Sequence, residues 1–203
     1  MMNEKGKLFV ISGPSGAGKG TVIDRVMELR GDLKFSVSAT TRSKREGEID
    51  GVHYFFVSRE QFMEMAENGG LLEYNSYLGN LYGTPLGPIQ EHIEAGGLML
   101  LDLESNGARQ VKKIIPDCAT IYLTPSTFAE IERRLIKRGT ESAEEIGRRI
   151  AQARTDSVYA VNFDYIIIND QIDEAVRDFL AIIDGEGEYC RADARIGDIE
   201  YEK

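Results

Sequence analysis

Seven residues near the start of the chain have the composition of a phosphate-binding loop. The segment GPSGAGK (13–19) follows the apolar run KLFVIS (7–12) and precedes a stretch with helical periodicity. Glycines let backbone N–H groups turn inward around phosphate oxygens, a helix N-terminus adds a favourable dipole, and Lys19 adds a full positive charge. A plain glycine turn is the alternative. Gly20 follows Lys19, so Thr21 carries the first hydroxyl that could reach a metal ion accompanying the phosphates.

Basic residues gather in two places of an acidic chain. The 203 residues carry a formal net charge of −10, so local groups of cations suggest pockets for small, highly charged ligands. Arg42 and Arg45 offer guanidinium forks that suit bidentate binding of phosphate oxygens. For the second group, a solvated helix face balanced by nearby glutamates is the alternative. This second group comprises Arg133, Arg134, Lys137, Arg138, Arg148, Arg149 and Arg154.

The composition argues against several functional classes. The negative charge would repel nucleic acid and anionic membranes, so we expect neither as a partner. The chain has no run of 18 apolar residues, and its first apolar stretch is too short for a signal peptide, so we expect a cytoplasmic protein. Cys118 and Cys190 have no CxxC or histidine partner spacing, which disfavours a disulfide framework or a zinc site.

The secondary-structure pattern predicts the fold class. Short apolar runs alternate with amphipathic stretches of helical period, which indicates a parallel α/β sheet covered by helices. Strands are expected at 7–12, 36–41, 54–57, 98–103, 119–124 and 165–169. Helices are expected from the glycine loop to about residue 30, at 58–69, 85–94, up to 115, at 127–138, from 142 onward and at 172–183, with capping boxes at 58–61 and 127–130.

Two further features bear on a site. The segment 71–84 is rich in tyrosine and carries Gly79-Asn80, which predicts an antiparallel hairpin and hence a small β lobe. Asp102 closes the apolar run LMLLDL (98–103), and the carboxyl ends of parallel strands face the ligand crevice. We therefore expect Asp102 to hold a metal ion through its water shell, with Thr21 as a second candidate ligand.

Five ordered blocks resemble guanylate kinases. TTRSKREGEIDGVHYFF (40–56) is similar to the signature of that family, and the glycine loop, LLE (71–73), GNLYGT (79–84) and LDLESNG (101–107) stand in the expected order. The resemblance covers about residues 6–184. It implies an enzyme that transfers the γ-phosphoryl group of ATP to GMP or dGMP with Mg²⁺. It also implies a P-loop core, a GMP-binding lobe at about 36–96 and a helical lid at about 134–155. The resemblance does not cover residues 185–203, whose polar composition indicates a C-terminal tail.

The resemblance also assigns individual residues. Guanine presents N1–H and N2–H donors on one edge, and Glu73 is the family's carboxylate for both; by itself Glu73 could equally be a strand residue facing water. Glu104 stands where many members have Asp, which keeps a carboxylate for the N2 edge. The remaining GMP residues are Ser38, Arg42, Arg45, Tyr54, Tyr82 and Thr84; the ATP residues are Gly13, Pro14, Ser15, Gly16, Ala17, Gly18, Lys19, Gly20, Thr21 and Asn169.

The expected mechanism rests on cations rather than on a general base. The attacking GMP oxygen is already anionic, so positioning and charge neutralisation would do the catalysis. Arg134 and Arg138 are four residues apart and share one helix face. In related kinases such arginines, here with Arg149, form a lid over the donor phosphates. We therefore predict Lys19, Arg42 and these three arginines as the catalytic cations.

Two rival functions remain open at this point. Guanylate-kinase-like domains also serve as inert scaffolds that bind peptides, but those typically have damaged P-loops, whereas Lys19 and the acceptor and lid arginines are present here. A kinase for another monophosphate would also fit Gly20-Thr21, but Glu73 and the 40–56 block oppose it. The sequence does not indicate the oligomeric state.

Overall fold

The computed structural model describes residues 6–77, 79–138 and 143–186. These residues form seven α-helices, nine strands and one short 3-10 helix, η1 (Ala160–Asn162). They divide into two compact units. The first unit comprises the described residues up to Leu8, with 32–101 and 109–118. The second comprises 9–31, 102–108 and the described residues from Ala119 onward.

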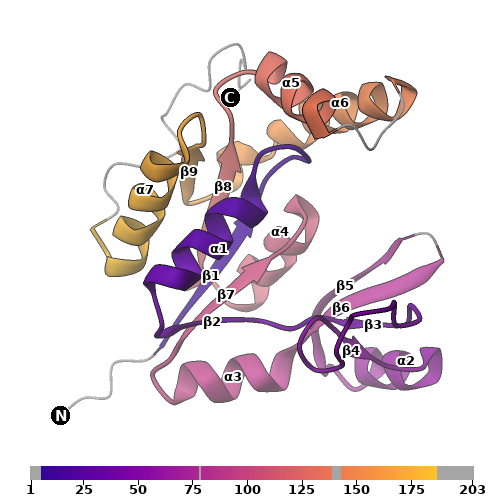
Figure 1. Cartoon of the computed structure of the whole chain (residues 1–203). Helices are drawn as coiled ribbons and strands as arrows, with labels where there is room; N and C mark the ends of the chain where they lie inside the picture. The colour runs from indigo at the N-terminus through magenta and orange to yellow at the C-terminus, as the bar shows by residue number, and fades with distance from the viewer. Residues whose placement is uncertain (1–5, 78, 139–142, 187–203) are drawn as a thin grey trace. The chain divides into compact units, whose positions relative to one another are not determined.

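A five-stranded sheet has the strand order β2-β7-β1-β8-β9 (Figure 1). Strand β2 pairs in parallel with β7, and β8 pairs in parallel with both β1 and β9. In this register Phe9 lies opposite Ala119, and Ile121 lies opposite Tyr165. All six residues of β8 are buried, as expected for an internal parallel strand. The bounds are β1 (Lys7–Ser12), β2 (Leu33–Phe35), β7 (Leu98–Asp102), β8 (Ala119–Thr124) and β9 (Tyr165–Ile168).

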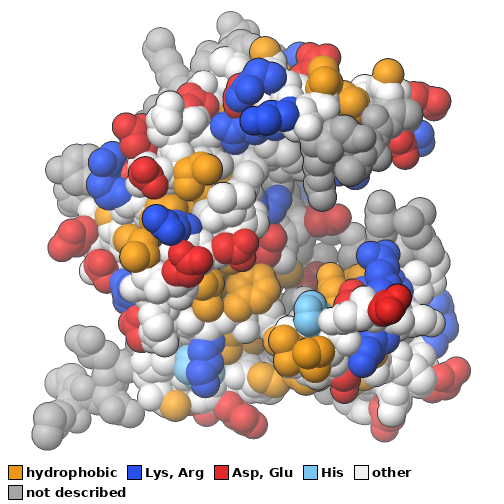
Figure 2. All heavy atoms as spheres, viewed as in Figure 1, with side chains coloured by type: hydrophobic (Ala, Val, Ile, Leu, Met, Phe, Trp, Pro, Cys, Tyr) orange, Lys and Arg blue, Asp and Glu red, His pale blue; other side chains and the backbone are white. Residues whose placement is uncertain are grey.

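Helices of the second unit pack in two groups. The helices α1 (Lys19–Leu29) and α7 (Ile172–Asp184) lie side by side (Figure 1), and Arg30 at the end of α1 forms an ion pair with Asp184. The helices α5 (Phe128–Arg138) and α6 (Ala143–Ser157) enclose a separate apolar cluster. Figure 2 shows lysine and arginine side chains gathered over α5. The α5/α6 cluster consists of Phe128, Ile131, Leu135 and Ala153, with Ile146 and Ile150 against it.

The first unit contains a four-stranded sheet with the order β4-β3-β6-β5. The predicted hairpin is present, with β5 (Leu71–Tyr77) antiparallel to β6 (Asn80–Pro85). The predicted capping box at Ser58 is also present, because Ser58 and Gln61 exchange both side-chain-to-backbone hydrogen bonds at the start of the next helix. The remaining elements of this unit are β3 (Ala39–Thr40), β4 (Phe55–Phe56), α2 (Arg59–Glu67) and α3 (Leu86–Glu94), and the core cluster here is Ala39, Phe62 and Leu81. Helix α4 (Ser105–Ile114) belongs to the second unit up to Ala108 and to the first from Arg109 onward.

The structure departs from the predicted elements around residues 33–41. The expected strand at 36–41 shrinks to β3, and the unpredicted strand β2 precedes it. The backbone N–H of Ser36 donates to the carbonyl of Leu100, so the segment follows β7 before it joins the second sheet. The expected helix start at Ser142 lies outside the described residues. None of the helices in the described ranges has the length and apolar composition that crossing a bilayer requires.

Candidate active site

The residues between β1 and α1 form a loop that requires glycine at two points. Gly13 has φ +150° and Gly18 has φ +89°. A Cβ atom at Gly13 would lie 2.0 Å from the carbonyl oxygen of Leu123, and one at Gly18 would lie 2.6 Å from the side-chain nitrogen of Asn169. The loop therefore packs closely against β8 and the residue that follows β9. Gly18 caps α1 without a side chain, which leaves the first helical N–H groups available to an anion.

Lys19 and Asp102 supply the charges next to this loop. The Lys19 ammonium donates to the carbonyl oxygen of Gly13 at 2.7 Å, so it folds back over the loop to which phosphate oxygens would bind. Asp102 ends β7 and is exposed to solvent. Desolvation by the surrounding protein raises the pKa of its carboxyl group, and the positive charge of Lys19 opposes that shift. The ammonium and the carboxylate are thus within electrostatic range of each other.

Arg134 on α5 uses all three of its guanidinium nitrogens for contacts within the protein. One terminal nitrogen donates to the carbonyl of Ala17 at 3.1 Å, and the other donates to the carbonyl of Asn169 at 2.7 Å. Nε donates to Glu130 at 2.6 Å. The side chain is only 23% exposed. Arg134 therefore ties α5 both to the glycine loop and to the end of β9.

Asn169 stands between the loop and the sheet. Its Nδ2 donates to the carbonyl of Ala17 at 2.7 Å, and its backbone N–H donates to the carbonyl of Thr124. The residue is 2% exposed, and its Oδ1 is buried without a hydrogen-bond partner in the described part of the chain. Because Nδ2 already faces a carbonyl, the amide presents Oδ1 as an acceptor with a fixed orientation.

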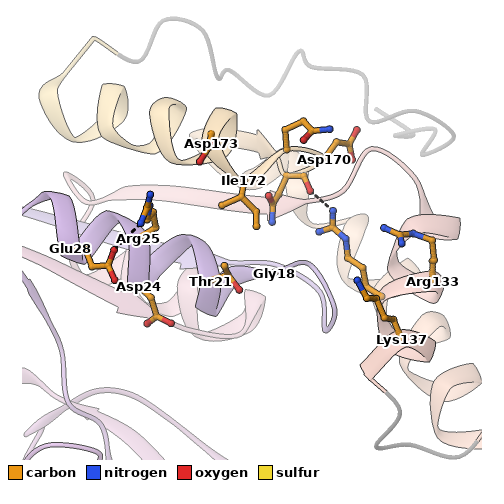
Figure 3. Close-up of a pocket in the computed structure, with 13 residues that line it drawn as sticks. Gly18, Thr21, Asp24, Arg25, Glu28, Arg133, Lys137, Asp170, Ile172 and Asp173 are labelled. Atoms are coloured by element: carbon orange, nitrogen blue, oxygen red, sulfur yellow. Dashed lines mark hydrogen bonds and ion pairs between the residues drawn. The ribbon is translucent and has the colours of Figure 1, made fainter.

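A pocket of about 840 Å³ lies next to Arg134 and Asn169. Figure 3 shows it between α1, α5 and the start of α7, with Thr21 on α1, Ile172 on α7 and Lys137 on α5. Ile172 is 47% exposed and adds an apolar surface to a largely charged lining. The other lining residues are Gly18, Asp24, Arg25, Glu28, Arg133, Asp170, Gln171 and Asp173. The pocket has the size and the mixed polarity of a site for a small organic ligand.

The other two predicted lid arginines follow on α5 and α6. Arg149 on α6 donates to the hydroxyl of Ser15 in the glycine loop at 2.5 Å. Arg138 is the last residue of α5, and its side chain lies outside the described part of the chain. Of the three predicted lid side chains, Arg134 and Arg149 therefore contact the loop directly.

A second constellation lies in the first unit around Arg42. The Arg42 guanidinium binds Glu48 through two hydrogen bonds of 2.7 and 3.0 Å. Its carbon lies 5.4 Å from the ring centre of Tyr54 and 5.6 Å from that of Phe56. Hydrogen bonding to Glu48 raises the pKa of Arg42, with a smaller contribution from Tyr82. The same bonds lower the pKa of Glu48 to about 2.

Arg45 and Tyr82 complete this constellation. The backbone N–H of Arg45 donates to Glu48 at 2.6 Å, while the Arg45 side chain is exposed. The rings of Tyr54 and Tyr82 meet edge to face at 6.1 Å between centroids. In this arrangement the Arg42 guanidinium binds the Glu48 carboxylate through two hydrogen bonds. A phosphate presents oxygen atoms with similar spacing and carries more negative charge, so the same guanidinium could bind a phosphate.

Glu73 and Thr84 form a pair across the hairpin. They lie opposite each other in the β5–β6 register, and the Thr84 hydroxyl donates to one carboxylate oxygen of Glu73 at 2.6 Å. Thr84 is 1% exposed, so its hydroxyl fixes the carboxylate from the buried side. Ser38 lies just before β3 and is partly buried, whereas Glu104 lies just before α4 and is exposed.

Sequence reasoning missed several residues that orient these groups. Glu48 stands six residues after Arg42 inside the same block, and an acidic residue among basic ones was the available signal. The threonines that begin the block, Thr40 and Thr41, bond to the backbone of β6. Glu130 binds Arg134 from four residues earlier on α5, a spacing that was also visible in the sequence.

The described residues contain no group of three or more His, Cys, Asp or Glu side chains that could hold a metal ion. Mg²⁺ usually keeps several waters and takes one or two carboxylates together with substrate phosphates. Asp102, solvent-exposed and near Lys19, fits that manner of binding.

The fold and the glycine loop define a class of protein. A parallel sheet with a Gly13–Lys19 loop between its strand β1 and helix α1 is the P-loop arrangement, which binds nucleotide phosphates. The chain is therefore a P-loop nucleotide-binding protein of mixed α/β class.

Comparison with known proteins narrows this class. A family model for guanylate kinase matches residues 5–186. A guanylate kinase of Lactobacillus delbrueckii subsp. bulgaricus is 47% identical over 91% of each chain. Another from Thermus thermophilus is 46% identical over 92% of this chain and 83% of that relative. The crystal structure of guanylate kinase from Anaplasma phagocytophilum superimposes with a TM-score of 0.71 at 28% identity, over 91% of this chain and 87% of that one.

The chain belongs to the guanylate kinase family. Its activity is ATP-dependent phosphorylation of GMP, so ATP and GMP are its substrates. Kinases that use ATP generally need a divalent metal ion.

Proposed function

We propose that the loop Gly13–Lys19 holds the phosphates of ATP while the γ-phosphoryl group passes to GMP. The observation that carries this proposal is the loop itself. Its glycines pack against β8 and against Asn169, which follows β9, and the Lys19 ammonium folds back to donate to the Gly13 carbonyl at 2.7 Å. Incoming phosphate oxygens would take the Lys19 ammonium from that carbonyl, which is a neutral and weaker acceptor. The start of α1, where Gly18 provides no side-chain cap, would add backbone N–H groups and a favourable dipole.

The pocket beside the loop suits the adenosine part of ATP. Three hydrogen bonds fix the plane of the Arg134 guanidinium and leave its flat faces for stacking on an aromatic base. The buried Oδ1 of Asn169 is an acceptor, which suits the exocyclic amine of adenine. Guanine carries a carbonyl oxygen at the corresponding position and would face acceptor with acceptor. These contacts favour ATP over GTP as the donor.

We assign the phosphate of GMP to Arg42, Arg45, Tyr54 and Tyr82. Arg42 now holds the Glu48 carboxylate with two parallel bonds, which is the geometry that a phosphate would require of it. A phosphate with about two negative charges would compete with that single carboxylate for the guanidinium. Tyr54 and Tyr82 lie together and bring neutral hydroxyl donors.

We assign the reading of guanine to Glu73, with Ser38, Thr84 and Glu104 as its companions. The Thr84 hydroxyl binds one oxygen of the Glu73 carboxylate and so fixes the orientation of the group. The carboxylate can then accept from both N1–H and N2–H of guanine. Adenine offers neither of these donors, because its N1 is an acceptor and it has no N2 amine.

We propose Mg²⁺ as the divalent ion, held by Asp102 through water and by the ATP phosphates. When bound, Mg²⁺ would neutralise charge on the transferring group. Thr21 remains a second candidate ligand, although it lines the pocket beside the loop together with Asn169. We assign that pocket to the adenosine part of ATP, and Asp102 does not line it. Asp102 is therefore the better supported of the two metal ligands.

The chain's own cations account for the remaining chemistry. The GMP oxygen that attacks is already ionised, so no side chain has to remove a proton. Arg42 orients this phosphate, and Lys19 with the lid arginines 138 and 149 meets the charge that spreads over the transferring group, while Arg134, whose three nitrogens already bind within the protein, holds the glycine loop and the base. Arg149 already contacts Ser15, so it reaches the loop without any large rearrangement of its own helix.

The proposed division of the chain follows these roles. We assign residues 6–184 to one guanylate kinase domain, with the GMP-binding lobe at about 36–96, the lid at about 134–155 and a polar tail from 185. Because both substrates are metabolic nucleotides, we propose that the enzyme works in the cytoplasm and that dGMP also serves as an acceptor.

The loop assignment is tested by replacing the lysine charge. Lys19→Met should lower turnover by at least about tenfold, or ~1.4 kcal/mol, without unfolding the protein. Lys34→Met, on the exposed face of β2, is the matched control and should keep normal turnover. Steady-state kinetics with ATP and GMP measure both variants. Turnover of Lys19→Met above about a tenth of wild type would refute the proposed role of the loop.

A further inference from the structure

Two threonine hydroxyls connect the segment that leads from β3 to Arg42 with β6, the strand that carries Tyr82. The backbone ladder between β3 and β6 includes Thr40 opposite Tyr82, and β3 ends there. Beyond that point the bonds all involve one residue of β6, Leu81. Its carbonyl accepts from the Thr41 N–H at 3.0 Å and from the Thr40 hydroxyl at 2.9 Å, while its N–H donates to the Thr41 hydroxyl at 2.9 Å.

The Thr40 hydroxyl makes a second bond that reaches Arg42 itself. It accepts from the Arg42 backbone N–H at 3.2 Å while it donates to the Leu81 carbonyl. Thr40 is fully buried, so water has no access to replace either bond. The backbone of Arg42 is thereby fixed to the residue that immediately precedes Tyr82.

The side chains of Arg42 and Tyr82 also lie close together, at the proposed site for the acceptor phosphate. The Arg42 guanidinium lies against the ring of Tyr54, and that ring contacts the ring of Tyr82. After Glu48, Tyr82 also contributes to the raised pKa of Arg42. A shift of β3 against β6 would therefore separate groups that have to bind one phosphate together.

We propose that Thr40 and Thr41 are positioning residues that hold Arg42 and Tyr82 in one geometry for the acceptor phosphate. The proposal rests on the assignment of that phosphate to Arg42 and Tyr82. Phosphate binding by several donors needs them placed within fractions of an ångström, and buried hydroxyl bonds are directional enough to do so. Neither threonine has to touch the substrate.

The test compares valine and serine at both positions. Thr41→Val removes the acceptor for the Leu81 N–H and should raise the KM for GMP at least about fivefold, while the KM for ATP stays within about twofold. Thr40→Val should act in the same direction and more strongly, because it removes two bonds. Thr41→Ser and Thr40→Ser keep the hydroxyl and should restore the KM for GMP to within about twofold of wild type.

The matched control is Thr120→Val in the five-stranded sheet. Thr120 is 2% exposed, and its hydroxyl donates to Asp164. Its loss should lower the melting temperature but leave the KM for GMP unchanged, which separates positioning from a purely structural effect. Thr41 is only partly buried, so Thr41→Val remains a usable test if Thr40→Val fails to fold.

Arg42→Lys distinguishes failure of this inference from failure of the acceptor assignment. If Arg42→Lys raises the KM for GMP but the folded threonine variants do not, the positioning role is wrong and the acceptor site stands. If Arg42→Lys leaves the KM for GMP unchanged, the acceptor assignment is wrong and this inference falls with it. A rise in the KM for GMP that Thr120→Val reproduces would also overturn the positioning role.

Discussion

Replacement of Arg134 by lysine should loosen the glycine loop because one guanidinium there makes three separate bonds. Two go to the carbonyls of Ala17 and Asn169, and the third goes to Glu130. A lysine keeps the charge and can satisfy one partner, but it has no planar fork to reach the others. If the lysine binds Glu130, the carbonyls of Ala17 and Asn169 both lose their donor from this position. Water replaces that donor poorly, because the Arg134 side chain is only 23% exposed.

The magnitude follows from the two lost bonds. A hydrogen bond from a charged donor contributes about 1.5 kcal/mol at the lower end of its range, so Arg134→Lys should cost about 3 kcal/mol in the free energy of unfolding. For a domain of this size, each kcal/mol shifts the melting temperature by about 2–4 °C. The variant should therefore melt about 6–12 °C below wild type. Its KM for ATP should also rise, since Ala17 belongs to the loop.

Arg133→Lys is the matched control one residue earlier on the same helix. Arg133 is 64% exposed, and its guanidinium binds Glu130 alone among the described residues. An exposed pair of this kind contributes about 0.5 kcal/mol, so this variant should melt within about 2 °C of wild type. Thermal unfolding followed by circular dichroism measures both. Equal melting temperatures for the two variants would refute the role given to Arg134.

Three further changes test individual groups. Desolvation raises the pKa of Asp102, so the ionised carboxylate opposes folding above its unfolded pKa of about 3.9. Asp102→Asn should therefore have a higher melting temperature than wild type at pH 7. In kinetic assays the same variant should lose at least about tenfold in turnover. Gly18→Ala would strain a residue at φ +89° and press on Asn169, so urea unfolding should show a loss of about 1–2 kcal/mol or more. The pKa of Glu48 is lowered to about 2 by Arg42, so Glu48 stabilises the fold above about pH 4.5 and loses this effect as the pH falls toward 2. Glu48→Gln should therefore be less stable than wild type at pH 6, and urea titrations should show the gap narrowing below about pH 4.5 and closing only near pH 2.

Much of the fold could be predicted because its signals are local. The capping box at Ser58 needs residues three apart, and the hairpin at 71–84 needs only its turn and alternating strands. The glycine loop was equally visible, since strand, loop and helix follow one another. Strand β2 was missed because three residues show no periodicity and only Leu33 is buried; its pairing with β7 stabilises it.

The candidate site was predictable in its charged residues but not in what orients them. Spacing put Arg134 on one helix face with Arg138, yet its partner carbonyls lie 117 and 35 residues away in sequence. The same holds for Thr40 and Thr41, whose partner Leu81 is 41 and 40 residues distant. Such contacts depend on how the sheets assemble, and a single sequence contains no local signal for them.

The preference for GMP over AMP in wild type and in Glu73→Gln tests the account most directly. Glutamine keeps the shape of Glu73, removes its charge and offers an amide that can donate to N1 of adenine. Glu64→Gln on the exposed face of α2 is the control and should leave the preference unchanged. In steady-state kinetics, kcat/KM for GMP should fall steeply in Glu73→Gln, and the GMP-to-AMP preference should narrow by at least about tenfold, or ~1.4 kcal/mol. An unchanged preference would show that Glu73 does not read the base and that the guanine site lies elsewhere.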